Sequence, residues 1–152
     1  MIVFGSAAHG AGRRRQVPAM GIHVHKGEWM ESGDDPRLSP TISLIEQPPG
    51  TVLDAHFHRQ NQFQVFVEGA GAIGPASLSP VTIHYAGAYS AYGPLAAGSE
   101  GIKYFTIRPV CESGAYPVRT SREHMVRGPR RHATSAGLKL HAPEELARLR
   151  QV

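Results

Sequence analysis

GTVLDAHFHRQNQFQVFVEG, residues 50–69, is the stretch that decides the fold. It contains His56 and His58, which are separated by one residue. In an extended strand, residues two apart point to the same face, so both imidazoles can converge on one point. Neutral imidazole is a ligand of Zn, Cu, Fe and Ni. The pair therefore predicts a metal site, and the alternative is two histidines that face a polar cavity without metal.

The second half of this stretch has the pattern of a β-strand. Phe63, Val65 and Val67 alternate with Gln62 and Gln64, which is the period of two that is typical of strands. The two glutamines therefore share one face. If this strand forms a hairpin with the histidine segment, the amide oxygen of Gln62 becomes a candidate third ligand.

The spacing of the stretch resembles the first motif of the cupin superfamily, G-x5-H-x-H-x3-E-x6-G. Gly50, His56, His58 and Gly69 stand at its fixed positions, and Gln62 stands where the family has a metal-ligating Glu. The resemblance implies an all-β fold with a single jelly-roll β-barrel. The sequence outside it predicts extended N- and C-terminal tails and one short C-terminal helix. The resemblance also implies a divalent metal (Fe, Mn, Ni, Cu or Zn) held by the two histidines and Gln62.

A second, less complete resemblance lies downstream. Gly87 and Pro94 fit the second cupin motif, but Ala88 replaces its Asp and no His follows. Only Glu100 offers a ligand near the position of that His. The usual three-histidine site is therefore not available from the motif residues. Either the first-motif residues hold a metal with water or a substitute ligand, or the site binds none.

Other polar residues are candidates for the wall of a pocket. Gln64, Tyr92 and Tyr104 are predicted to contact a small-molecule ligand, and the alternative for the tyrosines is packing at the barrel mouth. His84 lies in an alternating segment. It has either a purely structural role, with its ring hydrogen-bonded inside the fold, or it faces the cavity as a ligand or acid-base group. These roles are left open by the pattern.

The composition describes a globular chain of one domain. The 152 residues are 41% hydrophobic and 18% charged, and 17 Gly and 12 Pro favour turns and short strands. Cys111 is the single cysteine, which excludes an internal disulfide and suits a reducing compartment. No run approaches the roughly 18 apolar residues of a membrane span, and the N-terminus lacks the order of a secretory signal. We therefore expect a cytoplasmic protein with no membrane contact.

The chain divides into three predicted parts: a loose arm over 1–20, the barrel over 21–118 and a basic tail over 119–152. The tail contains eight Lys or Arg and three Glu. Its arginines lie among Gly, Pro and His without a helix-turn-helix pattern, so a solvated surface is favoured over nucleic-acid binding.

Further strands are predicted over three ranges, 41–46, 81–85 and 101–108. Residues 141–150 read as a helix, because a Pro and two Glu precede the terminal arginines in the order that suits the helix dipole. Leu146 and Leu149 give this helix one apolar stripe, so we expect it to dock on another surface.

Two functions follow from the resemblance. One is a metal-dependent dioxygenase or isomerase that acts on a small, anionic organic substrate. The other is a non-catalytic cupin module that binds a small molecule without metal. The sequence leaves undecided whether the protein is an enzyme, and cupin analogy implies a homodimer.

Overall fold

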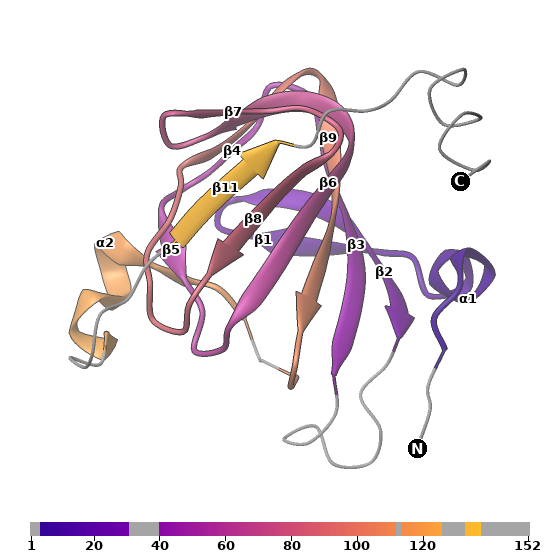
Figure 1. The fold of residues 1–152 in the computed structure, drawn as a ribbon, viewed down its shortest axis with the longest axis horizontal. Coiled ribbons are helices and arrows are strands. Elements are labelled where there is room, and N and C mark those ends of the chain that lie inside the picture. Colours follow the sequence, from indigo (N-terminus) through magenta and orange to yellow (C-terminus); the bar gives the residue numbers. More distant parts are fainter. Residues whose placement is uncertain (1–3, 31–39, 112–113, 126–132, 138–152) are drawn as a thin grey trace, which may run out of the picture.

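The computed structural model describes residues 4–30, 40–111, 114–125 and 133–137. Their regular structure is almost entirely antiparallel β-sheet, with helical turns only outside the barrel (Figure 1). The elements run in this order: α1 Ala7–Gly12, β1 Arg15–Ala19, β2 Ile22–Met30, β3 Thr41–Gln47, β4 Val52–Leu53, β5 His56–Phe57, β6 Gln62–Ile73, β7 Ala76–Leu78, β8 Thr82–Ala86, β9 Leu95–Arg108, β10 Tyr116–Pro117, α2 Val118–Ser121, a 3₁₀ turn Arg122–His124, and β11 Ala133–Gly137.

Nine strands of the described chain form one curved sheet in the order β1-β2-β3-β9-β6-β8-β11, with β4 on β9 and β7 on β6. A second sheet contains β10 and β5 only. Strand β9 lies between β3 and β6, so strands distant in the sequence are neighbours in space. Strand β1 passes behind β6 and β8 and closes that side of the barrel (Figure 1).

The predicted strands 41–46, 81–85 and 101–108 are found as β3, β8 and β9, although β9 begins earlier, at Leu95. Strand β6 also continues past the predicted end, to Ile73. It does so because Gly69 has a φ of 78°, which offsets the register against β9 without ending the pairing. A Cβ at Gly69 would collide with the carbonyl oxygen of Gly101, so only glycine fits.

Much of the predicted loose arm is ordered structure. Residues 7–12 form helix α1, and residues 15–19 form β1, which pairs with β2 along its whole length. Met20 and Gly21 join the two strands with φ angles of 47° and 88°, the conformation of a two-residue hairpin turn. The first residue of such turns is commonly Asn or Asp. Because Met20 occupies this position, the sequence did not predict the hairpin.

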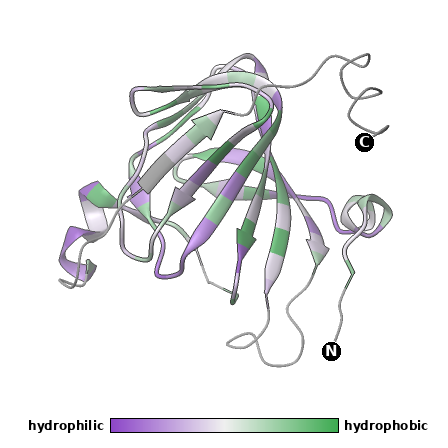
Figure 2. Ribbon diagram, viewed as in Figure 1, coloured by the Kyte–Doolittle hydropathy of each residue, from purple (hydrophilic) through white to green (hydrophobic). Residues whose placement is uncertain are grey.

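The central strands carry polar residues inward and apolar residues outward. Gln62, Gln64, His84 and Thr106 are buried, whereas Phe63, their neighbour on β6, is 48% exposed. The alternation is visible as bands of opposite hydropathy along the ribbon (Figure 2). An apolar core fills the rest of the barrel, and its members are Leu53, Phe66, Ile73, Leu78, Ala86, Tyr92, Leu95, Ala97, Ile102 and Tyr104. The polar interior therefore marks where a ligand site can lie.

Several predictions fall outside the described residues. They are most of the basic tail and the helix over 141–150. The part of the tail that the structure does describe includes β11, which pairs with β8. None of the helices among the described residues is long and apolar enough to cross a membrane.

Candidate functional site

The site is built around Tyr92, a residue between strands β8 and β9. Its backbone is fixed by two 3.0 Å hydrogen bonds with His56, in which each residue's N–H donates to the other's carbonyl. Its ring lies among three imidazoles, with centroid distances of 4.5 Å to His56, 6.2 Å to His58 and 4.7 Å to His84. Tyr92 thus occupies the centre on which the histidines converge.

A directed chain of hydrogen bonds passes through the Tyr92 hydroxyl. Nδ1–H of His56 donates to the carbonyl oxygen of Asp54 at 2.7 Å, so its Nε2 carries no proton and accepts from the hydroxyl at 2.8 Å. The hydroxyl accepts in turn from the amide nitrogen of Gln62. The amide oxygen of Gln62 accepts from Nε of Arg108 at 3.1 Å. Each of these four hydrogen bonds therefore joins a donor to a complementary acceptor.

Burial holds these histidines in the neutral form. Removal from water lowers the pKa of His56 to about 4, although the hydrogen bond to Asp54 acts in the opposite direction. The same desolvation lowers the pKa of His84 to about 4. Desolvation also raises the pKa of Tyr104, which is fully enclosed, so its phenol is neutral as well. At neutral pH these three side chains are therefore uncharged, and the charge of Arg108 contacts the site through Gln62.

The two remaining polar pairs tie the site to the barrel wall. Nδ1–H of His58 donates to the carbonyl oxygen of Gly114 at 2.8 Å, so a residue after β9 orients this imidazole. Nδ1–H of His84 on β8 donates to the amide oxygen of Gln64 on β6 at 2.8 Å. Both contacts fix which ring nitrogen carries the proton.

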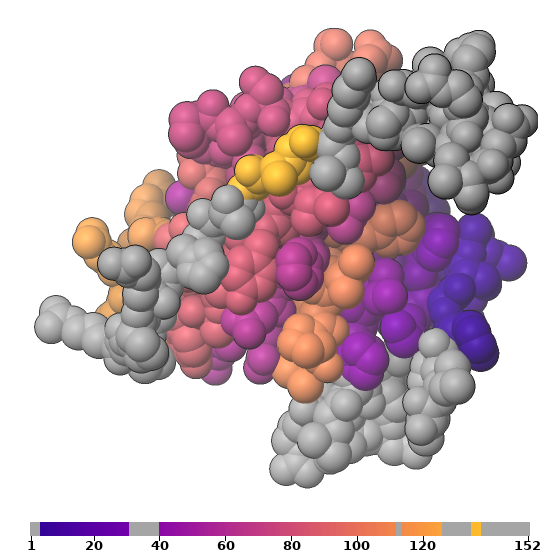
Figure 3. Space-filling view, in the orientation of Figure 1, coloured from indigo at the N-terminus to yellow at the C-terminus, as the bar shows by residue number. Residues whose placement is uncertain are grey.

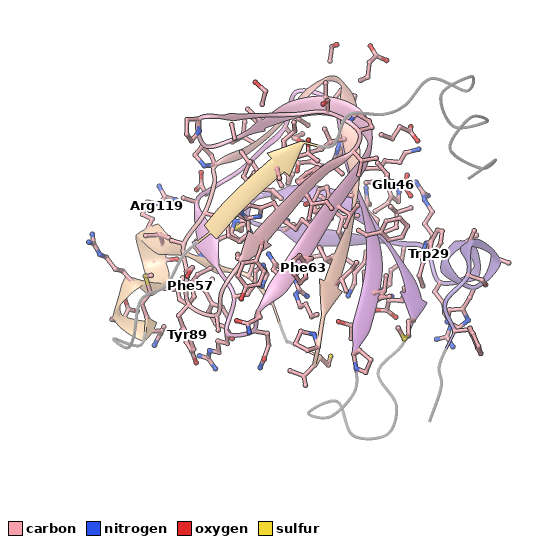
Figure 4. All side chains as sticks on the ribbon, in the orientation of Figure 1. Trp29, Glu46, Phe57, Phe63, Tyr89 and Arg119 are labelled. Carbon is pink, nitrogen blue, oxygen red and sulfur yellow. The ribbon has the colours of Figure 1, made fainter. Side chains whose placement is uncertain are left out.

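Two cavities meet at Tyr92. The first has a volume of about 190 Å³ and lies inside the barrel. Its walls are Val17, Ala19, Met20, Val24, Lys26, Ile45, Leu53, His56, His58, Gln64, Tyr92, Tyr104, Thr106, Arg108, Gly114 and Ala115. The second, of about 400 Å³, lies on the other side of the ring beside His84 and Ser135. Figure 4 shows how densely side chains fill the barrel around these spaces.

The structure brings all six predicted site residues into one region. His56, His58, Gln64, Tyr92 and Tyr104 line the first cavity, and Gln62 reaches it through its bond to the Tyr92 hydroxyl. The ligand roles assigned to these residues stay predictions. The structure also locates the two residues whose roles the sequence left undecided. His84 lines the second cavity, whereas Glu100 is solvent-exposed and lies outside the site.

Sequence reasoning missed Arg108 and the central position of Tyr92. A signal for Arg108 was present, because the period of two places it on the same face of β9 as Tyr104 and Thr106. Its partner Gln62 depends on the pairing of Phe63 with Ile107, a register that sequence alone does not reveal. The position of Tyr92 depends on its pairing with His56, which is equally non-local.

The donor set, as arranged, does not fit a divalent metal ion. Nε2 of His56 is already engaged by the Tyr92 hydroxyl, and Gln62 directs its nitrogen, not its oxygen, toward that centre. The amide oxygen instead faces the guanidinium of Arg108. Across the described ranges, no three side chains of His, Cys, Asp or Glu converge as metal ligands.

Comparison with known proteins gives structural matches only. No protein-family model matches the chain, and neither does any curated protein sequence. An RmlC-like cupin protein from Ralstonia eutropha JMP134 matches with a TM-score of 0.52 and 17% identity, over 80% of this chain and 85% of that one. Its overlap with nearly the whole of both chains shows a common single-barrel architecture.

Two larger proteins match over part of their length. A mutant of Bacillus subtilis oxalate decarboxylase OxdC matches with a TM-score of 0.55 and 10% identity, over 70% of this chain and 30% of that one. The structure of Rhodobacter sphaeroides SigE in complex with the anti-sigma ChrR matches with a TM-score of 0.51 and 19% identity, over 66% of this chain and 55% of that one. The chain thus corresponds to less than a third of the decarboxylase. These likenesses confirm the predicted jelly-roll barrel, and the chain has the fold of the cupin superfamily.

Proposed function

We propose that the barrel is a binding module for a small organic acid, held without metal in the 190 Å³ cavity beside Tyr92. The observation that carries this proposal is the charge of the cavity wall. Lys26 and Arg108 line it, and no Asp or Glu is among the described residues that do. Lys26 also pairs with Glu28 on the same strand at 3.3 Å, so Arg108 is the principal cation of the wall. A carboxylate is the group that complements such a wall, because charge-assisted hydrogen bonds to guanidinium and ammonium are the strongest a neutral-pH site offers.

The volume limits the ligand to a small molecule. A volume of about 190 Å³ suits a short-chain carboxylic acid better than a nucleotide or a peptide. The apolar part of the wall, which includes Val24, Ile45 and Leu53, would contact the carbon chain of such an acid.

Neutral polar groups would orient the rest of the ligand. Thr106 and Tyr104 bring hydroxyls to the cavity, and Gln64 brings an amide. Because the oxygen of Gln64 accepts from His84, its NH₂ group is the part that remains to donate to a ligand. A hydroxy or keto acid would match this set better than a simple fatty acid.

A ligand panel tests the proposal. We expect three- to six-carbon acids to raise the Tm of the protein, and their uncharged amides to leave it unchanged. Replacing Arg108 with Gln should weaken acid binding at least about tenfold, since a hydrogen bond to a charged group contributes about 1.5–3 kcal/mol. The matched control is Lys103→Gln, which removes a cation that pairs with Glu68 outside the cavity. Equal binding of acid and amide, or unchanged binding to Arg108→Gln, would contradict the proposal.

The second candidate is the metal site predicted from the sequence, and with it a dioxygenase or isomerase activity. One observation favours it: Nδ1–H of both His56 and His58 donates to a backbone carbonyl. This anchoring leaves Nε2 of each ring without a proton and is the support that metal-binding histidines usually have. A metal would require the Tyr92 hydroxyl to leave Nε2 of His56.

Elemental analysis separates the two candidates. Near-stoichiometric Fe, Mn, Ni, Cu or Zn in the wild-type protein, lost in a His56→Ala/His58→Ala variant, would support the metal site. For the metal-free module we expect no bound metal in the wild type and no uptake of added metal. The informative partner variant is Gln62→Glu, because it restores the carboxylate of the family motif. It should also form an ion pair with Arg108 and thereby weaken the binding of an organic acid.

The predicted homodimer, the cytoplasmic location and the absence of a nucleic-acid partner remain part of this proposal. Light scattering across protein concentrations tests the dimer. Salt-dependent DNA binding that is lost on truncation at Thr120 would instead indicate a nucleic-acid role for the basic tail.

A further inference from the structure

The outward side of the central strands is an apolar surface that the described residues leave exposed. We define the outer strip as the residues on β6, β8 and β9 that point away from the cavity: Phe63, Val65, Val67, Ile83, Tyr85 and Ile107. Phe63 is 48% exposed and Val67 is 37% exposed, and the others are half-buried. Register connects them, since Phe63 pairs with both Tyr85 and Ile107, and Val65 pairs with Ile83. Figure 3 views the molecule from this side.

The neighbouring part of the same face is already covered by a helix. Helix α1 packs on β2, where Gly10 lies directly against the ring of Trp29. Trp29 in turn packs edge-on against Phe105, with ring centroids 4.7 Å apart. Figure 4 shows Trp29 beside α1 and Phe63 farther along the sheet. The fold thus uses a short helix to shield the β2 side of the outer face, and the outer strip lies farther along the same sheet, beyond β3.

The dimensions of the outer strip are those of one more short helix. Three strands spaced about 4.8 Å apart measure roughly 10 Å across, and Phe63 to Val67 spans roughly 13 Å along β6. A ten-residue helix is about 15 Å long and 10–12 Å wide. A stable interface between two copies buries about 800 Å² on each partner, several times what a strip of this size offers. A segment of the same chain needs far less area, because its effective concentration is high.

Strand β11 carries the chain to this place. Its last residue, Gly137, pairs with Thr82, which pairs with Phe66, so the chain leaves β11 two strands from β6 and level with the end of the outer strip. Fifteen residues follow, LKLHAPEELARLRQV. Three extended residues, 138–140, reach about 10 Å, which is the distance from β11 to β6. The predicted helix over 141–150 can therefore begin above the outer strip.

We propose that residues 141–150 dock as an amphipathic helix on the outer strip. Leu146 and Leu149 form its apolar stripe and contact Phe63 and Val65. Glu144 and Arg148 lie on the opposite side of the helix and face water. The docked helix is the counterpart of α1, and together the two terminal segments cover the apolar outside of a barrel whose inside is polar.

Hydroxyl-radical footprinting of the full-length protein tests this docking. We expect Phe63 and Tyr85 to be protected in the wild type. In a Leu146→Ser/Leu149→Ser variant this protection should be lost, so that both are oxidised as fast as in a chain truncated after Gly137. The matched control is Glu144→Ser/Arg148→Ser, which changes the water-facing side and should keep the protection. Circular dichroism and the melting curve of each variant verify that the barrel is folded.

Three outcomes would overturn the proposal. Equal oxidation of Phe63 in the wild type and the leucine variant would show that the segment does not cover it. Loss of protection in the Glu144→Ser/Arg148→Ser control would show that the leucines are not the contact. Protection that survives truncation and rises with protein concentration would identify a second copy of the chain as the occupant.

Discussion

The hydroxyl of Tyr92 is the residue-level feature that distinguishes this site, because it bonds both the His56 imidazole and the Gln62 amide. Removing it leaves two buried polar atoms without that partner. We expect Tyr92→Phe to lower the free energy of unfolding by about 1–3 kcal/mol, measured by urea denaturation. Tyr116→Phe is the control, since Tyr116 contributes a ring stacked on Phe57 and should tolerate the change. An equally small effect of both substitutions would contradict the hydrogen-bonded chain.

The depressed pKa values of His56 and His84, both about 4, make stability depend on pH. An unfolded histidine titrates near 6.5, so below that pH the unfolded chain takes up protons that the folded chain excludes. The free energy of unfolding should therefore fall as the pH drops from about 6.5 toward 4, by at most roughly 3 kcal/mol for each histidine. Urea denaturation at pH 7, 6 and 5 measures this slope.

The slope can be assigned to a residue by substitution. His84→Gln should remove about one proton from the uptake on unfolding and flatten the dependence on pH. The matched control is His23→Gln, which replaces an exposed histidine on β2. A slope that His84→Gln does not alter would show that this imidazole is not held neutral by burial.

In strand β6, Gly69 is required both by its own backbone conformation and by a close contact with another strand. Gly69 has a positive φ and lies against the carbonyl of Gly101, whereas Gly21 has a positive φ and open space where a Cβ would lie. Gly21→Ala therefore isolates backbone strain, which costs about 1–3 kcal/mol. Gly69→Ala adds a steric clash to this strain and should lower the free energy of unfolding further. Equal losses, measured by denaturant unfolding, would show that β6 and β9 separate easily here.

The strands also show what sequence can and cannot predict. The alternation after Gln62 predicted β6 because it is a local pattern. The barrel was predicted because the spacing of the histidines and glycines resembles the first cupin motif, which is also local in the sequence. The hairpin of β1 and β2 escaped detection, since its turn begins with Met20 and not with a typical turn residue. The partner of Gln62 escaped as well. Arg108 reaches it only through the register of β6 with β9, which tertiary pairing determines.

Considered as a whole, the molecule has polar side chains inside and apolar side chains outside around its central strands. In the proposed binding module, the polar lining serves the ligand at a cost in stability. Thr106→Val should reveal this. Its hydroxyl makes only a long, 3.4 Å hydrogen bond to Ser43, so the variant should be about as stable as the wild type, or more so, while binding organic acids more weakly. Calorimetric titration and thermal melting measure the two effects.

The matched control for this prediction is Thr82→Val. The Thr82 hydroxyl donates to the carbonyl of Ser79 at 2.7 Å and does not line the first cavity. This variant should lose about 1–3 kcal/mol of stability and keep its affinity for the acid. If Thr106→Val instead lost stability and retained binding, the interior polarity would serve the fold and not a ligand.

The position of β9 between β3 and β6 affects how the protein can fold while it is being synthesised. Strand β3 ends at Gln47 and β9 ends at Arg108, so the two halves of the sheet cannot join until the ribosome has made both. At 5–20 residues per second this takes on the order of several seconds. During that time the nascent hairpin of β2 and β3 shows its apolar side to the cell. We expect the newly made chain to be more prone to aggregation during this interval than the finished barrel.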